Sequence, residues 1–207
     1  MALRRFPTGS PVTAAPEAPP ITSTWRPEEL TSEDAEVRRQ AIWMAPPSSA
    51  LAQALCQQLA DEKNHAVLEA MFVALSRCHA ETVVPAMFEL LASEDVVLRT
   101  RALEVLEVFP QAVAQQMQAQ LAQAPADVRI FLVNLMGGLC HAQVPQWLEF
   151  ILLNDTHQNV VAAALEVALE VGSTELRAAI AATKGRFHAD PFIGFAADLA
   201  LERIETQ

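Results

Sequence analysis

Apolar residues recur at intervals of three and four positions along the chain from about residue 30 onward. Leu98, Ala102, Val105 and Leu106 form one such run. This spacing places its members on one face of an α-helix. Short polar turns separate the apolar runs, each of which lasts about ten to fifteen residues. The pattern predicts eleven helices, and no strand, between residue 30 and the end of the chain.

The helical runs also repeat in sequence. The segment SEDAEVRRQAI, residues 32–42, aligns with SEDVVLRTRAL, residues 93–103, at an offset of 61 residues. Val67 and Phe72 occupy the same template positions between these two segments, so the offset corresponds to two units of about 31 residues. A second amphipathic segment follows each template helix but the last: Ala50 to Leu59, Val84 to Leu91, Gln111 to Leu121, Val144 to Leu153, and Leu176 to Ala182.

Short helices of this kind cannot bury their apolar faces alone, so neighbouring pairs must stack on one another. We therefore predict an all-α fold, an α-solenoid of about five to six helix pairs over residues 29–207. Residues 1–28 are rich in proline and small polar residues and are predicted to form a flexible arm.

The segment VPAMFELLASEDVVLRTRALEVL, residues 84–106, resembles the short bacterial HEAT-like (armadillo-like) repeat first associated with phycobilin lyases. The hallmarks are Val-Pro opening one helix, an acidic turn, and Val-Arg with a small residue in the next helix. The resemblance extends over about residues 30–204. It implies a ladder of turn acids and arginines between stacked units, here Asp34, Arg38, Asp95, Arg99, Arg129 and Asp190. The ladder is expected to be patchy, because Asn64 and His157 replace the acid, and Leu68 and Val161 replace the arginine.

Two similar segments, CHAETVVP at residues 78–85 and CHAQVP at residues 140–145, raise the possibility of a metal or haem site. Two repeats separate them by about 20 Å, whereas zinc ligands lie about 2.3 Å from one ion. Haem attachment would need a cysteine where Leu75 and Gly137 stand. We interpret the segments as a repeated structural unit, with Pro85 and Pro145 in first helical turns and all three cysteines as reduced, buried thiols.

The charge of the chain restricts its partners. A net charge of −11 opposes general affinity for nucleic acid and for anionic lipid. The N-terminal segment has no long apolar run, so neither export nor a membrane span is expected, and we expect the protein in the bacterial cytoplasm. The chain lacks a Gly-rich phosphate loop and the His-Glu-x-x-His and Gly-x-Ser-x-Gly motifs. We therefore expect no catalytic residues, no cofactor and no metal.

In HEAT-like stacks the Val-Arg helices line the concave side, so the same position in each unit should face one groove. That position holds Trp43, Val73, Glu104, Asn134, Glu166 and Leu199. We predict a partner-binding surface made of Arg39, Trp43, Glu69, Arg101, Glu104, Glu107, Asn134, Glu166 and Glu170, flanked by Asp198. Its acidic character favours a basic or amphipathic peptide, with Trp43 as the main anchor. Alternatively, the acids only keep the surface soluble, and Trp43 caps the core of the first unit.

These features favour a non-enzymatic adaptor, scaffold or assembly factor that holds a protein or peptide. The alternative is a subunit of a phycobilin-lyase-like enzyme that holds a tetrapyrrole or its acceptor protein. That alternative would require a roomy pocket and basic residues for the propionates, for which Arg39 and Arg101 are candidates. Trp25 and Trp147 are assigned to packing, and Pro191 with Phe187, Phe192 and Phe195 to a cap over the last core layer.

Overall fold

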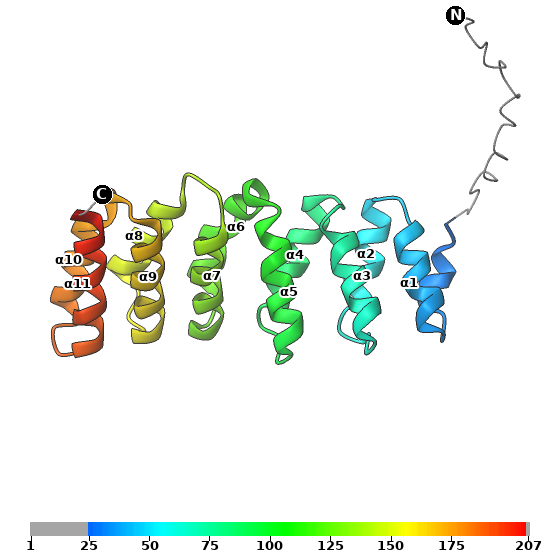
Figure 1. Ribbon diagram of the computed structural model, residues 1–207, viewed down its shortest axis with the longest axis horizontal. Coiled ribbons are helices and arrows are strands. Elements are labelled where there is room, and N and C mark those ends of the chain that lie inside the picture. The colour runs from blue at the N-terminus through cyan, green and yellow to red at the C-terminus, as the bar shows by residue number, and fades with distance from the viewer. Residues whose placement is uncertain (1–24, 206–207) are drawn as a thin grey trace, which may run out of the picture.

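The computed structural model describes residues 25–205, which form α-helices and two short 3-10 helices and contain no strand (Figure 1). The eleven α-helices confirm the predicted number and the all-α class. They are α1 (Ala35–Met44), α2 (Ser49–Gln58), α3 (His65–Leu75), α4 (Ala80–Leu90), α5 (Val96–Glu107), α6 (Pro110–Gln123), α7 (Ala126–Gly138), α8 (Val144–Asn154), α9 (Gln158–Val171), α10 (Arg177–Arg186) and α11 (Pro191–Glu205). The 3-10 helices are η1 (Pro27–Thr31) and η2 (Thr174–Leu176). Most of the predicted arm lies outside the described residues, and η1 spans the predicted boundary at residue 28.

The helices form two layers, as expected for an α-solenoid. Each odd-numbered helix packs against the next odd-numbered one, from α1 through to α11. Of the even-numbered helices, α2 packs against α4, α4 against α6, and α8 against α10. Figure 1 shows the odd-numbered helices as a row in chain order, from blue at α1 to red at α11. The template helices therefore share one layer, as the repeat predicted.

One continuous apolar core lies between the layers. Leu98, Ala102, Val105 and Leu106 of α5 are all buried, as their spacing predicted. Trp147 is also buried in this core, and Trp25 packs partly against it. Burial of these apolar side chains is the main force that stabilises the short helices, because isolated helices of this length are only marginally stable in water.

The turn acids of the template act as helix N-caps. The side chains of Asp34, Asn64 and Asp95 accept hydrogen bonds from backbone amides at the starts of α1, α3 and α5. Asp190 does the same for α11, accepting from the amides of Phe192 and Ile193. Asn64 serves as well as an aspartate because capping requires only a side-chain oxygen acceptor.

The arginine ladder is present but binds different acids from those predicted. Arg38 donates to Glu62 at 2.8 and 2.9 Å, and Arg129 donates to Asp155 at 2.7 and 3.0 Å. Each acid lies in the turn of the following unit, two residues before the capping position. Arg99 instead lies over the ring of Phe131, 5.2 Å from its centroid. The prediction was wrong about the partners, because Arg38 and Arg129 reach acids that lie two residues before the capping position of the next helix.

Pro85 does not lie in a first helical turn as predicted. Helix α4 begins at Ala80, so Pro85 is inside the helix. Ala80, Glu81 and Thr82 extend the helix toward the N-terminus, and the predicted start at Val84 was therefore too late. Pro145 does lie in the first turn of α8, where its missing N–H group has no intrahelical acceptor to lose.

The three cysteines also differ from one another. Cys78 is buried, Cys56 is half-buried and Cys140 is exposed, so the prediction of three buried thiols was wrong for Cys140. Cys140 lies in the loop before α8, whereas His79, next to Cys78, directly precedes α4. Burial raises the pKa of the Cys56 thiol to about 11, and Cys78 adds to this effect. Cys56 is therefore a protonated thiol at neutral pH.

Candidate functional site

The predicted row of residues lies on the outward surface of α1, α3, α5, α7, α9 and α11, which we call the odd-helix face. All six members of the row are exposed: Trp43, Val73, Glu104, Asn134, Glu166 and Leu199. Their equivalent template positions explain this, because stacked helices present the same side to solvent in every unit. Because the row holds aromatic Trp43, acidic Glu104 and apolar Leu199, the N-terminal, central and C-terminal parts of the odd-helix face differ in chemistry.

Trp43 dominates the N-terminal part of the odd-helix face. Its side chain is 49% exposed, so it does not cap the core of the first unit. The guanidinium carbon of Arg77 lies 5.9 Å from the centre of a Trp43 ring, within reach of a cation–π interaction. Arg39, on the same helix, is paired with Glu36 through hydrogen bonds of 2.9 and 2.6 Å. An amphipathic aromatic surface therefore remains available to a partner here.

Ion pairs of Arg101, one to a neighbouring helix and one within α5, occupy the central part. Arg101 of α5 is hydrogen-bonded to Glu69 of α3, and it also donates to Glu104 at 2.6 Å. Two of the predicted acids are therefore partly neutralised by an arginine of the same surface. Such exposed pairs contribute little to stability, but they leave this part less acidic than its sequence suggests.

An apolar cleft of about 470 Å³ occupies the C-terminal part of the odd-helix face. It contains Asn134, Glu166 and Leu199 from the predicted row. The other lining residues were not predicted: Ile130 of α7, Asn159, Ala162, Ala163, Leu165 and Leu169 of α9, and Phe192, Phe195 and Ala196 of α11. None of these described lining residues is basic. The cleft thus adds an apolar region to a surface that was predicted from the sequence to be acidic.

Phe192 and Phe195 of α11 were predicted to cap the last core layer, and that prediction was wrong. Phe192 and Phe195 are 66% and 63% exposed, so they form a wall of the cleft and do not cap the core. The core side of α11 consists instead of Ile193, Ala197, Ala200 and Ile204. Helix α11 thus has two apolar sides, one that faces the core and one that carries Phe192 and Phe195. Packing against the core requires only one apolar side, so the second was the sequence signal that could have revealed the cleft.

Carboxylates gather at the end of α7 beside the cleft. A Cβ atom on Gly138 would lie 2.2 Å from Oε1 of Glu107, and one on Gly137 would lie 3.5 Å from Oε2 of Glu170. Glu107 of α5 and Glu170 of α9 thus approach this helix end from both sides. Within residues 25–205, no ion pair joins Glu107, Glu166 or Glu170 to a basic side chain. The predicted flanking residue Asp198 differs, because it pairs with Lys184 of α10 at 2.5 Å.

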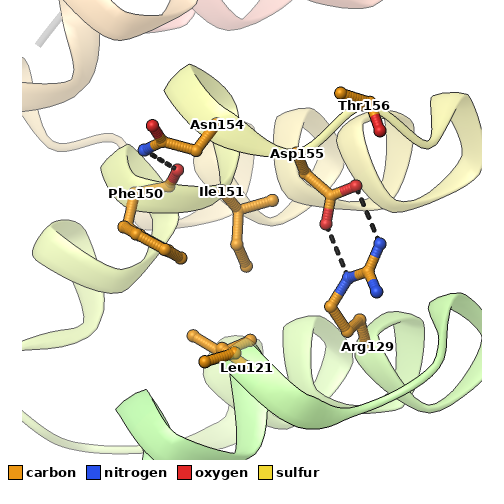
Figure 2. A pocket seen from close by; sticks show the side chains of 8 residues that line it. Leu121, Arg129, Phe150, Ile151, Asn154, Asp155 and Thr156 are labelled. Atoms are coloured by element: carbon orange, nitrogen blue, oxygen red, sulfur yellow. Dashed lines mark hydrogen bonds and ion pairs between the residues drawn. The ribbon is translucent and has the colours of Figure 1, made fainter.

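A second pocket, of about 250 Å³, surrounds the Arg129–Asp155 pair (Figure 2). Burial raises the pKa of the Asp155 carboxyl, but hydrogen bonds from Arg129 and from the His157 amide outweigh this effect and lower it. Arg129 also donates to the carbonyl of Ala124 at 2.9 Å. Because the charges satisfy one another, we interpret this pocket as a structural connection between α7 and the turn after α8.

Among the described residues, no three His, Cys, Asp or Glu side chains gather closely enough to hold a metal ion. Nor does any helix between residues 25 and 205 combine the length and apolar character needed to cross a bilayer.

No protein-family model matches this chain, and no curated protein matches it in sequence. Among solved structures, an engineered protein is similar at 18% sequence identity and a TM-score of 0.42, with 87% of this chain and 95% of that chain covered. A designed armadillo repeat protein is similar at 14% identity and a TM-score of 0.40, covering 86% of this chain and 98% of that chain.

Proposed function

We propose that this protein is a non-enzymatic scaffold that holds a partner protein on the odd-helix face. The observation that carries the proposal is the apolar cleft, whose wall exposes Phe192 and Phe195 on the same face as Trp43. Clustered exposed aromatic side chains are costly to leave in water and mark interaction surfaces. Stacked repeats also provide the extended surfaces on which proteins bind partners.

The alternative of a tetrapyrrole-holding lyase subunit receives less support. A bilin carries propionates, and the described lining of the cleft has no Lys or Arg to pair with them. The two arginines that the sequence suggested for this role are engaged elsewhere, Arg39 with Glu36, and Arg101 with Glu69 and Glu104. A protein partner therefore fits the surface better than an acidic chromophore.

The proposal is tested by affinity capture from the native host, followed by mass spectrometry. Wild-type protein is compared with Trp43→Ala on the odd-helix face and with Phe150→Ala on α8, which also removes an exposed aromatic ring. We expect Trp43→Ala to weaken partner binding by about 2 kcal/mol or more, as for an interface anchor. Equal loss with Phe150→Ala would show that the odd-helix face is not the binding surface.

A further inference from the structure

We infer that the cleft between α7, α9 and α11 binds an amphipathic helix of the partner, with an aromatic or leucine anchor and with Lys or Arg at one end. This inference rests on the proposed function and specifies the chemistry of the partner. Three properties of the cleft support it: its shape, the state of its backbone groups, and the position of its charges.

The shape of the cleft matches a short helix. Asn159, Ala162, Ala163 and Glu166 follow one side of α9 at helical spacing and line the cleft. From Asn159 to Leu169 this side of α9 is about 15 Å long, or nearly three helical turns. The small alanine side chains lie between the larger side chains of α7 and those of α11. A rod-shaped apolar ligand can therefore lie along α9 between the two neighbouring helices.

The backbone of the cleft favours a helix over an extended strand. Every lining residue belongs to α7, α9 or α11, and apart from Asn159 and Phe192 in first helical turns, each lies where its backbone N–H group can bond within its own helix. An extended peptide would bring unpaired N–H and C=O groups into an apolar cleft that offers no strand edge to pair with. A helix satisfies its own backbone groups, so it can enter without this cost.

The charges of the cleft lie at one end. Glu166 lines the cleft and Glu170 lies one turn further along α9, toward its C-terminus. Glu107 lies against Gly138, at the C-terminal end of α7. The partial negative charge of the helix C-termini adds to that of the carboxylates. Basic residues near one end of the bound helix would meet these acids, while its apolar side contacts Phe192 and Phe195.

The test uses the full-length protein and a fluorescent synthetic helix as long as α9, 14 residues, with a Phe/Leu stripe and Lys residues at one end. One matched peptide carries Glu in place of Lys, and another has the same composition in an order that destroys the stripe. We expect Phe195→Ala or Glu166→Lys to weaken binding about tenfold or more. The matched changes on α8, Phe150→Ala and Glu149→Lys, should leave binding unchanged. Circular dichroism checks that every variant is folded.

Several outcomes would overturn the inference. Equal binding of the scrambled peptide would indicate nonspecific adsorption to an acidic protein, and equal binding of the Glu peptide would refute the charge argument. A dimer that Phe195→Ala dissociates in sedimentation would make a second copy the occupant. Tighter peptide binding after deletion of residues 1–24 would make that segment the occupant.

The proposed function and the inference about the cleft can be tested separately. If the captured partner is lost with Trp43→Ala but kept with Phe195→Ala and Glu166→Lys, the scaffold function stands and the cleft inference fails. If the peptide binds as expected but no captured protein depends on the odd-helix face, the cleft is a helix-binding site and the scaffold function fails.

Discussion

Arg129 of α7 donates two hydrogen bonds to Asp155 in the turn after α8, one of 2.7 Å from Nε to Oδ2 and one of 3.0 Å from Nη2 to Oδ1 (Figure 2). The two side chains are only 21% and 7% exposed. The pair joins consecutive units of the solenoid through a planar, two-pronged contact that lysine could not provide.

We predict that Asp155→Asn lowers the free energy of unfolding by about 1–3 kcal/mol, because Arg129 loses a charged acceptor in a poorly hydrated place. Urea denaturation measures the change. The control is Asp198→Asn, which removes an exposed pair with Lys184 and should cost less than about 1 kcal/mol. Equal effects of the two changes would contradict a special role for the Arg129–Asp155 contact.

Low pH should weaken both the Arg129–Asp155 pair and the Arg38–Glu62 pair. Burial raises the pKa of both Asp155 and Glu62, but arginine and backbone hydrogen bonds lower each below its ordinary value, 3.8 and 4.5 respectively. A carboxyl group with a lowered pKa in the folded state stabilises the protein above the unfolded pKa. This stability is lost as the pH falls through the folded pKa. Thermal midpoints should therefore fall below about pH 4.5, and Asp155→Asn should show a smaller fall than wild type.

Pro85 provides a test of helix α4. Pro85→Ala restores an N–H group that can donate to the carbonyl of Glu81, so we expect the free energy of unfolding to rise by about 1 kcal/mol. Pro145→Ala, in the first turn of α8, gains no such bond and should not stabilise the protein. Thermal denaturation compares the two. Stabilisation by Pro145→Ala alone would argue against the observed start of α4.

Two adjacent residues of α11 face opposite sides: Ile193 faces the core, and Phe192 faces the cleft. Ile193 is 1% exposed, so Ile193→Ala should cost about 2–5 kcal/mol of unfolding free energy. Phe192→Ala removes a larger side chain that is mostly in water, and it should cost less than about 1 kcal/mol. Denaturant titration of both variants provides the comparison. A large loss with Phe192→Ala would restore the interpretation of this residue as a cap.

Thiol labelling should distinguish the three cysteines. In the native protein we expect only Cys140 to react rapidly with an aromatic disulfide reagent, because Cys78 is buried and the raised pKa of Cys56 keeps that thiol protonated. Cys140→Ser should abolish the rapid phase, and denaturant should expose the other two thiols. Rapid reaction of Cys78 in the folded protein would contradict its burial.

The sequence by itself determined which segments are helical and which residues begin several of them. Spacing of Leu98, Ala102, Val105 and Leu106 is a local property, because an apolar stripe on a helix depends only on residues a few positions apart. The repeat also indicated that equivalent residues such as Trp43 and Glu166 would share one exposed face. Because similar units stack in the same way, a residue that faces outward in one unit has equivalents that face outward in the other units.

Only the tertiary structure decided which side chains meet across units. The pairing of Arg38 with Glu62 joins residues 24 positions apart, and it depends on how the turns of neighbouring units are placed. Exposure of Cys140 likewise depends on the loop before α8, although its sequence resembles that around buried Cys78. The cleft depends on how three helices of different units are placed. The second apolar side of α11 indicates an exposed apolar surface, but it does not place the other two walls. Phe195 was therefore predicted to cover the core, and it is a surface residue because no further helix within residues 25–205 packs over that side of α11.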